Sequence, residues 1–332
     1  MSVPSVGVVG SGGWGTALAL LMARRGLQVP VWGHDSAHVE AMRVSRRNEK
    51  YLPGIELPGN VNPTASLTEC LKAPILLVAV PSKYLACVTR QLAEASGDRR
   101  PVLVSCTKGI EREHGLLMSE VMEENFPGAM LAVLSGPNLA GEIAKGVPAA
   151  GVIGCDDPAA LSAVQALFEG TTFRAYTSGD LRGIQLGGAL KNVFAIAAGV
   201  SDGLGLGENA KAALVTRSLA EMTRLGTAMG GRRETFSGLS GIGDLMVTCF
   251  SERSRNHQVG LRLGRGESLE SITASMSMVA EGVPTAASAR AAARRLGVET
   301  PLIDAVHAVL EGQASPAGVM QALMSRQLKA EE

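Results

Sequence analysis

The chain of 332 residues is long enough for two domains with large buried cores. Its 31 basic residues balance 31 acidic residues, and aromatic residues make up only 3% of the sequence, so the composition favours neither a nucleic acid nor an anionic membrane as the main partner. The five cysteines are scattered without metal-ligand spacing, and the first predicted strand begins near the N-terminus. We therefore expect a cytoplasmic protein with reduced thiols, no bound metal ion and no signal peptide.

Strands and helices alternate over the first half of the sequence. Short apolar segments predict strands at Val6–Gly10, Val29–Trp32, Ile75–Val80, Val102–Cys106, Met130–Leu134, Ala150–Gly154 and Thr172–Tyr176. Helical periodicity predicts helices between them at Trp14–Arg25, Lys83–Ala95, Leu116–Asn125, Asn138–Lys145 and Pro158–Phe168. Because near-continuous apolar strands are buried on both faces, these elements predict a doubly wound parallel sheet. We expect Pro30 at a strand end or irregularity, and an irregular excursion over Ser45–Pro63.

A glycine-rich turn between the first strand and the first helix consists of Gly10, Ser11, Gly12, Gly13, Trp14 and Gly15. In this G-x-G-x-x-G pattern the first glycine allows a tight turn, the second lets the backbone approach a pyrophosphate, and the third lets helix and strand pack closely. The helix N-terminus adds free N–H groups and the positive end of the helix dipole. The turn therefore predicts a Rossmann-type dinucleotide site. The alternative is an ordinary strand-to-helix turn in a chain with 40 glycines.

The end of the second predicted strand bears on the type of dinucleotide. An acidic residue at this position usually binds the ribose hydroxyls of NAD. Here the strand ends in Trp32, Gly33, His34 and Asp35, so no carboxylate stands at the first positions and His34 is free to face a 2′-phosphate. We expect NADP(H) as the cofactor, with NAD(H) also accepted. The alternative is that His34 is a surface residue which either cofactor tolerates.

After Ser178 the strand patterns stop. Helical patterns alone follow, over residues 180–200, 208–229, 237–249, 255–263, 268–276, 284–296, 300–311 and 315–326. The sequence thus predicts an NAD(P)-binding Rossmann domain over residues 1–180 and an all-α substrate and catalytic domain over residues 181–332. The longest weakly charged stretch, Gly183–Ser201, contains glycines, amides and one lysine, so it is a poor candidate for a membrane span.

Three loops at predicted strand ends carry candidate ligand contacts, because ligands of open parallel sheets bind beyond the carboxyl ends of the strands. These loops contain Pro81, Lys108 and the segment from Gly136 to Asn138. Ordinary turn chemistry is the alternative for the first and third loops. Lys108 has no acidic neighbour before Glu111, which favours a ligand contact over a solvated lysine.

Lys191 is the only charged residue between Arg182 and Asp202. Its neighbours on the same helical face are small, and they are Gly187, Gly188, Ala195 and Ala198. Another part of the molecule can therefore approach this lysine closely. Desolvation lowers the pKa of a lysine toward neutrality, which suits proton transfer to a carbonyl oxygen. The alternative is a structural lysine that is ion-paired or reaches the solvent.

A second polar group of residues follows in the all-α half. Asp244 and Thr248 are one helical turn apart and share a face. Ser254, Arg255 and Asn256 then offer a hydroxyl, a planar guanidinium and an amide, a combination that suits a phosphate monoester. The alternative is a solvated basic surface turn.

Together these segments resemble the bacterial type of NAD(P)-dependent glycerol-3-phosphate dehydrogenase. The resemblance covers nearly the whole chain and rests, in order, on GSGGWGTA, NEKYLPGIELP, AVPS, CTKGIE, SGPNLAGEI, GGALKNVFAIAAG and SGIGDLMVTCFSERSRN. The pair GGALKNV and GIGDL…SRN is far more specific than the glycine turn. The resemblance implies reversible reduction of dihydroxyacetone phosphate to sn-glycerol 3-phosphate, supply of the glycerophospholipid backbone, and a homodimer.

The resemblance also implies roles for individual residues. Lys191 matches the proton donor and acceptor, with Lys108 as a second lysine near the reacting carbons and Asp244 orienting the Lys191 ammonium. The expected substrate-binding residues are Lys108, Gly136, Asn138, Lys191, Asn192, Asp244, Thr248, Ser254, Arg255 and Asn256. The expected cofactor-binding residues beyond the glycine turn are His34, Pro81, Lys108, Ala140, Arg255, Val279 and Glu281. Spacing alone would make Glu281 an ordinary solvated residue.

Two other functions share much of this pattern. A β-hydroxyacid or 6-phosphogluconate-type dehydrogenase has the same domain order but needs a site for a substrate carboxylate, whereas the Ser-Arg-Asn sequence suits a phosphate. A catalytically silent dinucleotide sensor would bind NADPH without turnover. The combination of Lys191, Asp244 and Arg255 speaks against the sensor.

Overall fold

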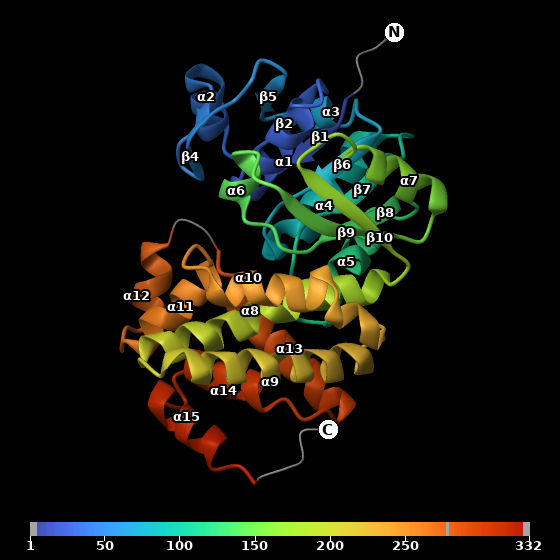
Figure 1. Cartoon of the computed structure of the whole chain (residues 1–332). Coiled ribbons are helices and arrows are strands. Elements are labelled where there is room, and N and C mark those ends of the chain that lie inside the picture. The colour runs from blue at the N-terminus through green and yellow to red at the C-terminus, as the bar shows by residue number, and fades with distance from the viewer. Residues whose placement is uncertain (1–4, 277–278, 328–332) are drawn as a thin grey trace.

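The computed structural model describes residues 5–276 and 279–327, which form a sheet domain followed by a helical domain (Figure 1). The main sheet has the strand order β10-β9-β8-β7-β6-β1-β2-β5. Its strands are β1 Gly7–Val9, β2 Val29–Trp32, β5 Val61–Thr64, β6 Ile75–Val78, β7 Val102–Ser105, β8 Met130–Ser135, β9 Ala149–Cys155 and β10 Phe173–Ser178. The predicted fold class, a Rossmann-type domain followed by an all-α domain, is confirmed.

The sheet is parallel except at one junction. Strands from β5 to β8 run in one direction, whereas β9 is antiparallel to β8 and β10 is parallel to β9. The apolar strand pattern predicted a parallel sheet throughout. The reversal could not be inferred from an apolar strand pattern, because such a pattern does not indicate strand direction. The connection from β8 to β9 contains the short helix α6, Ala140–Ala144. The last two strands therefore end at the opposite edge of the sheet from the other six.

Helices cover both faces of the sheet. They are α1 Gly13–Ala23, α2 Ser36–Ser45, α3 Leu67–Cys70, α4 Ser82–Ser96, α5 Met118–Asn125, α6 and α7 Pro158–Ala166. In β6, Ile75 and Leu77 face the core shared with α1, α6 and α7, while Leu76 and Val78 face the core shared with α4 and α5. Burial on both faces explains why the strand is apolar throughout.

The expectation of an irregular excursion over residues 45–63 is wrong. This segment contains the two-stranded antiparallel sheet of β3 Arg47–Asn48 and β4 Leu52–Glu56, followed by β5, which pairs with β2. Asn48 is buried and its amide donates to the Ser11 carbonyl at 2.9 Å and to the Thr16 hydroxyl at 2.7 Å. These contacts order the segment, and they depend on residues far away in sequence. Pro30 is the second residue of β2, near the beginning of the strand.

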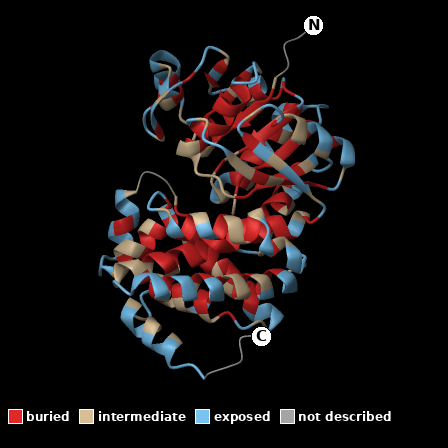
Figure 2. Cartoon of the chain, viewed as in Figure 1, coloured by how far each residue is buried: buried red, intermediate tan, exposed pale blue. Residues whose placement is uncertain are grey.

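The second half of the chain is helical. Its elements are α8 Leu181–Gly203, α9 Gly207–Ala228, α10 Asp244–Phe250, α11 Arg255–Gly264, α12 Leu269–Ser275, α13 Gly282–Leu296, α14 Pro301–Leu310 and α15 Pro316–Met324. The helix expected over residues 237–249 is divided into a π-helical turn, Leu239–Gly243, and α10. Helix α8 is the centre of this domain and is buried along most of its length (Figure 2). It is also long and apolar enough to cross a membrane, but 89% of its most apolar window is buried inside the protein, as in a core helix.

Helices α8 and α11 pack backbone to backbone. Glycines stand at the contact on both helices, and they are Gly199, Gly203, Gly260 and Gly264. A Cβ atom on Gly260 would lie 1.9 Å from the carbonyl oxygen of Ile196, and one on Gly199 would lie 2.0 Å from that of His257. Only glycine permits this approach, which brings the beginning of α11 close to the middle of α8.

Gly260→Ala should therefore destabilise the protein by about 1–3 kcal/mol, because the methyl group forces the two helices apart. Urea denaturation measures the change in the free energy of unfolding. Gly141→Ala is the matched control, since a Cβ at this position in α6 contacts nothing within 4 Å and the replacement should be neutral or slightly stabilising. Equal stability of the two variants would show that the α8–α11 contact is not close.

Candidate active site

The glycine turn has the geometry of a phosphate-binding loop. Gly10 has a φ of 122°, and a Cβ here would lie 2.5 Å from the Ala79 carbonyl oxygen. A Cβ on Gly15 would lie 1.9 Å from the carbonyl oxygen of Gly10. By contrast, a Cβ on Gly12 would contact nothing in the described chain. Gly10 and Gly15 are therefore required by the fold, whereas Gly12 borders open space at the N-terminus of α1, where a pyrophosphate would lie.

The end of β2 places His34 and Asp35 in different surroundings. His34 is exposed, and the side chain of Asp35 accepts hydrogen bonds from the backbone N–H groups of Ala37 and His38, each at 3.1 Å. The bond from His38 is the main reason that the pKa of Asp35 lies below its usual value. Asp35 is thus the N-cap of α2, and both bonds are accepted by one of its oxygens, Oδ1.

The strand order sets the distance between His34 and Lys108 along the carboxyl edge of the sheet. His34 follows β2 and Lys108 follows β7, with β1 and β6 between them. Three strand spacings give about 14 Å. An extended dinucleotide can therefore reach from the end of β2, past the glycine turn, to Lys108.

One buried carboxylate holds both lysines. The side chain of Asp244 is completely buried, and its Oδ2 accepts a hydrogen bond from Lys108 Nζ at 2.6 Å. Its other oxygen, Oδ1, accepts a hydrogen bond from Lys191 Nζ. Lys191 also donates to the hydroxyl of Thr248 at 2.7 Å, and Lys108 to the carbonyl of Gly136 at 2.8 Å. Residues from the end of β7, from α8 and from α10 thus meet where the two domains join.

Burial controls the charge of Lys191. The side chain is only 8% exposed, and burial lowers its pKa to about 7, with Asp244 opposing the shift and Lys108 adding to it. A lysine of this kind both donates and accepts a proton near neutral pH. The glycines beside it allow the close approach that the sequence indicated, because a Cβ on Gly188 would lie 2.5 Å from the Ser135 hydroxyl and one on Gly187 would lie 2.4 Å from the Ser240 carbonyl oxygen.

The first turn of α11 lies against α8 next to Lys191. The amide of Asn256 donates to the side-chain oxygen of Asn192 at 2.8 Å and accepts from the backbone N–H of Gly282 at 2.9 Å. Ser254 is the N-cap of α11. Arg255 is exposed, and its guanidinium donates to the Val279 carbonyl at 2.8 Å. An anion placed here would meet the N–H groups of a helix N-terminus and one guanidinium.

Glu281 links the two domains, which its sequence context did not indicate. Its carboxylate accepts hydrogen bonds from the Ser82 backbone N–H at 3.0 Å and from the Ser82 hydroxyl at 2.5 Å. Burial raises the pKa of Glu281, although Ser82 and Arg255 oppose the shift. Ser82 was not among the predicted site residues. No local signal marks it, because its partner is 199 residues away. Pro81 directly precedes this contact.

Buried polar atoms without hydrogen-bond partners lie at the end of β8, in the loop that follows it and in the glycine turn. Neither side-chain polar atom of Asn138 has a hydrogen bond within the described chain, and the same holds for the hydroxyl of Ser135 and for Nε1 of Trp14 in the glycine turn. Buried polar groups are normally paired, so these atoms mark places where a ligand or water completes the structure. Ala140 begins the short helix α6 just beyond Asn138. The described residues therefore fit a bound dinucleotide and a polar substrate.

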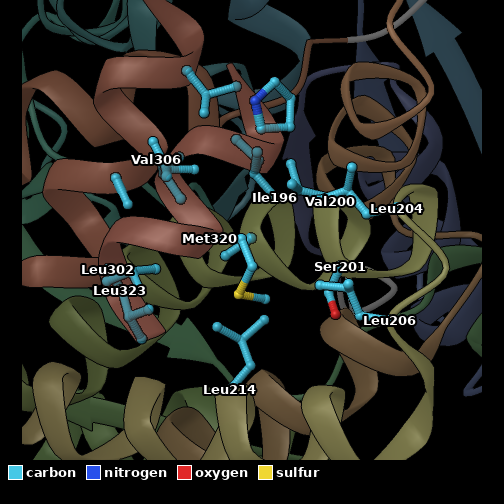
Figure 3. Close-up of a pocket in the computed structure, with 15 residues that line it drawn as sticks. Ile196, Val200, Ser201, Leu204, Leu206, Leu214, Leu302, Val306, Met320 and Leu323 are labelled. Carbon is cyan, nitrogen blue, oxygen red and sulfur yellow. The ribbon is translucent and has the colours of Figure 1, made fainter. Parts of the chain in front are cut away.

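A pocket outside this site has a different character. It has a volume of about 50 Å³ and is lined by residues of α8, α9, α14 and α15, with Val200, Leu214, Leu302 and Met320 among them (Figure 3). Ser201 supplies the polar side chain among its described lining residues, which are otherwise apolar. A phosphorylated substrate needs charged partners, so this cavity is unsuited to it.

One group of described residues has a spacing that could hold a metal ion. Glu111, Glu113 and His114 present ligand atoms within 4.8 Å of one another. However, Glu111 already accepts hydrogen bonds from the backbone N–H groups of Glu113 and His114, each at 2.7 Å, as in an ordinary surface turn. We assign no ion to this group.

Comparison with known proteins agrees with this geometry. Residues 5–161 match the model of the NAD-dependent glycerol-3-phosphate dehydrogenase N-terminus, and residues 180–321 match the model of its C-terminus. The chain belongs to this family. It is 48% identical to a glycerol-3-phosphate dehydrogenase [NAD(P)+] of Geobacter sulfurreducens over 98% of both chains, and 44% identical to one of Caulobacter vibrioides over 100% of both. The solved structure of glycerol-3-phosphate dehydrogenase from Coxiella burnetii is 35% identical, covers 98% of this chain and 99% of its own, and superposes with a TM-score of 0.94.

The glycine turn yields a test that separates folding from cofactor binding. Gly12→Ala should leave the melting temperature unchanged, because its Cβ meets no atom of the described residues within 4 Å, but should weaken NADPH binding about tenfold, or about 1.4 kcal/mol, by occupying the space of the pyrophosphate. Gly15→Ala should instead unfold or strongly destabilise the domain. Titration of NADPH fluorescence and thermal denaturation measure the two effects. Unchanged affinity in Gly12→Ala would place the cofactor elsewhere.

Proposed function

We propose that this member of the glycerol-3-phosphate dehydrogenase family reduces dihydroxyacetone phosphate to sn-glycerol 3-phosphate, reversibly, with NADP(H) and also with NAD(H). The observation that carries the proposal is the cluster of Lys108, Asp244 and Lys191 at the junction of the two domains. It places a lysine of lowered pKa beside a helix N-terminus suited to phosphate. The names of the close relatives support the same reaction.

We assign residues 1–180 to cofactor binding and residues 181–332 to substrate binding and catalysis. The cofactor would be held by the residues of the glycine turn, Gly10 to Gly15, and by a second set consisting of His34, Pro81, Lys108, Ala140, Arg255, Val279 and Glu281. When bound, the nicotinamide supplies the hydride. The exposed His34 after β2 supports NADP(H), because it would meet the 2′-phosphate, while Asp35 beside it serves as the cap of α2.

The residues of the chain act on the substrate as follows. Ser254, Arg255 and Asn256 anchor the phosphate. Lys191 donates a proton to the C2 carbonyl oxygen as this oxygen becomes negative, and Asp244 with Thr248 orients the donating ammonium. Further proposed contacts come from residues around these groups, which are Lys108, Gly136, Asn138 and Asn192.

One assay separates the proposed reaction from two alternative functions. NADPH absorbance should fall when dihydroxyacetone phosphate is added and only slowly with unphosphorylated dihydroxyacetone. A silent dinucleotide sensor would show no loss with either compound. A β-hydroxyacid or 6-phosphogluconate-type dehydrogenase would prefer a substrate with a carboxylate.

We also propose a cytoplasmic enzyme that supplies the glycerophospholipid backbone and acts as a homodimer. The homodimer rests on the family resemblance alone. The alanines of α13, such as Ala286 and Ala289, are fully buried within this chain and pack against α8 rather than offering a surface to a second copy.

Lys191→Ala should reduce turnover by about 10²–10⁴-fold, because the proton donor is lost, while NADPH binding is retained. Steady-state kinetics and NADPH titration measure the two properties. Turnover close to that of the unchanged protein would remove Lys191 from the role of general acid.

Arg255→Ala should weaken binding of dihydroxyacetone phosphate by about 1.5–3 kcal/mol, the range of hydrogen bonds to charged groups. The measurement is KM at saturating NADPH. If KM does not change, another residue anchors the phosphate.

The pH profile should respond to the charge of Asp244. Reduction needs protonated Lys191, so kcat/KM should decline as the pH rises through the lysine pKa of about 7. The Asp244 carboxylate raises that pKa, so Asp244→Asn lowers it, and the decline should begin at lower pH. The profile of kcat/KM between about pH 5 and pH 9 measures the shift. Arg255→Ala is the control, which should lower kcat/KM without moving the decline, and a shift to higher pH in Asp244→Asn would contradict the assignment.

A further inference from the structure

A second group of charged side chains lies close to the first turn of α11, outside the site described above, and its centre, Asp202, is partly buried with 25% of its side chain exposed. Asp202, in the last turn of α8, accepts hydrogen bonds at its Oδ2 from His257 Nε2 and from Lys211 Nζ, each at 2.7 Å. The side chain of His257 is 4% exposed and that of Lys211 is 8% exposed. The Lys211 ammonium also lies 4.8 Å from the ring centroid of Phe250, the last residue of α10. This Asp202 cluster therefore joins four helices.

The cluster reaches the proposed phosphate-binding turn through His257. This residue directly follows Asn256, and its backbone N–H donates to the hydroxyl of the N-cap Ser254 at 3.2 Å. Because a carboxylate only accepts hydrogen bonds, Nε2 is the protonated ring nitrogen. Helix α8 thus holds the turn by two side chains, through Asn192 with Asn256 and through Asp202 with His257.

The charge of Asp202 is fixed by its partners. Burial raises the pKa of Asp202, but the hydrogen bonds from Lys211 and His257 outweigh burial and lower it overall, so the carboxylate is ionised near neutral pH. A charged acceptor makes the bond from His257 stronger and more directional than a bond to a neutral group. The bond therefore fixes the direction of the Nε2–H group of His257 relative to α8, while Nδ1 has no partner within the described residues.

Orientation of the turn matters because a guanidinium binds phosphate through a planar pair of donors. The guanidinium of Arg255 donates to the Val279 carbonyl, and its base is set by the rotation of the first turn of α11, so its direction depends on both. A misplacement of about 1 Å in such a site can reduce catalysis about 10²-fold.

We propose that Asp202, acting through His257, is a positioning residue that orients Ser254, Arg255 and Asn256 toward the phosphate of the substrate, and so determines the preference for phosphorylated over unphosphorylated substrate. The inference rests on the proposed phosphate-binding role of those three residues. It assigns Asp202 and His257 no contact with substrate or cofactor.

The test compares dihydroxyacetone phosphate with unphosphorylated dihydroxyacetone in the full chain at saturating NADPH. His257→Leu should raise KM for the phosphorylated substrate at least about tenfold, with kcat little changed, because the first turn of α11 no longer orients its side chains toward the phosphate. The kcat/KM for dihydroxyacetone should stay within about twofold, since that substrate does not use the phosphate site. His257→Gln, which retains an N–H donor for Asp202, should restore most of the preference.

Lys211→Met is the matched control. It removes the other hydrogen bond to the same carboxylate oxygen but leaves α11 attached, so it should lower the melting temperature without changing KM. Should His257→Leu fail to fold, Asp202→Asn carries the test, because it keeps the size of the side chain and should raise KM about threefold or more through loss of the charge.

Three results would overturn the inference. One is an unchanged KM in His257→Leu or, if that variant fails to fold, in Asp202→Asn. Another is an equal loss with both substrates, which would indicate a general structural role, and the third is a Lys211→Met variant that shows the same selective loss. Arg255→Ala separates this inference from the proposed function. If Arg255→Ala loses the preference and His257→Leu does not, only the positioning role fails, whereas an unchanged preference in Arg255→Ala would overturn the phosphate site and the inference together.

Discussion

The pairing of one buried carboxylate with two lysines governs the arrangement of this protein. Asp244 is fully buried, and each of its oxygens accepts a hydrogen bond from a different lysine. Its negative charge compensates the positive charge of the lysines, whose burial would otherwise be costly. Asp244 belongs to α10, and its partners belong to the sheet domain and to α8, so the carboxylate joins the two domains. The same contacts that join the domains therefore also fix the distance between the proton donor and the edge where the cofactor is proposed to bind.

Much of this arrangement follows from patterns that are local in sequence. Alternating strands and helices with apolar strands such as β6 predict a sheet covered on both faces, and the glycine turn predicts a nucleotide edge. Lys191 could be recognised because its helical neighbours are glycine and alanine, and the structure shows backbone and side chains of other segments against Gly187 and Gly188. In these cases the physical reason for the prediction lies in the residue and its neighbours in sequence.

The parts that sequence reasoning missed depend on distant partners. Ser82 and Glu281 look like ordinary polar residues until the fold brings them together. The order in residues 45–63 depends on Asn48 bonding to the glycine turn, and β5 gains its partner only from β2. Composition and periodicity carry no information on such pairings.

The reversal of direction at β9 decides where α8 begins. Because β9 and β10 run against the other strands, β10 ends at the amino edge of the main sheet, and the first turns of α8 lie beside β9, where a Cβ on Gly154 would lie 2.5 Å from the Ile184 side chain. The helix then passes Ser135 at Gly188 and reaches the carboxyl edge at Lys191. From Leu181 to Lys191 the helix rises about 15 Å. Had β10 ended at the carboxyl edge, the same helix would have carried its lysine that distance past Lys108, so two reversed strands act as a spacer that sets the reach of the proton donor.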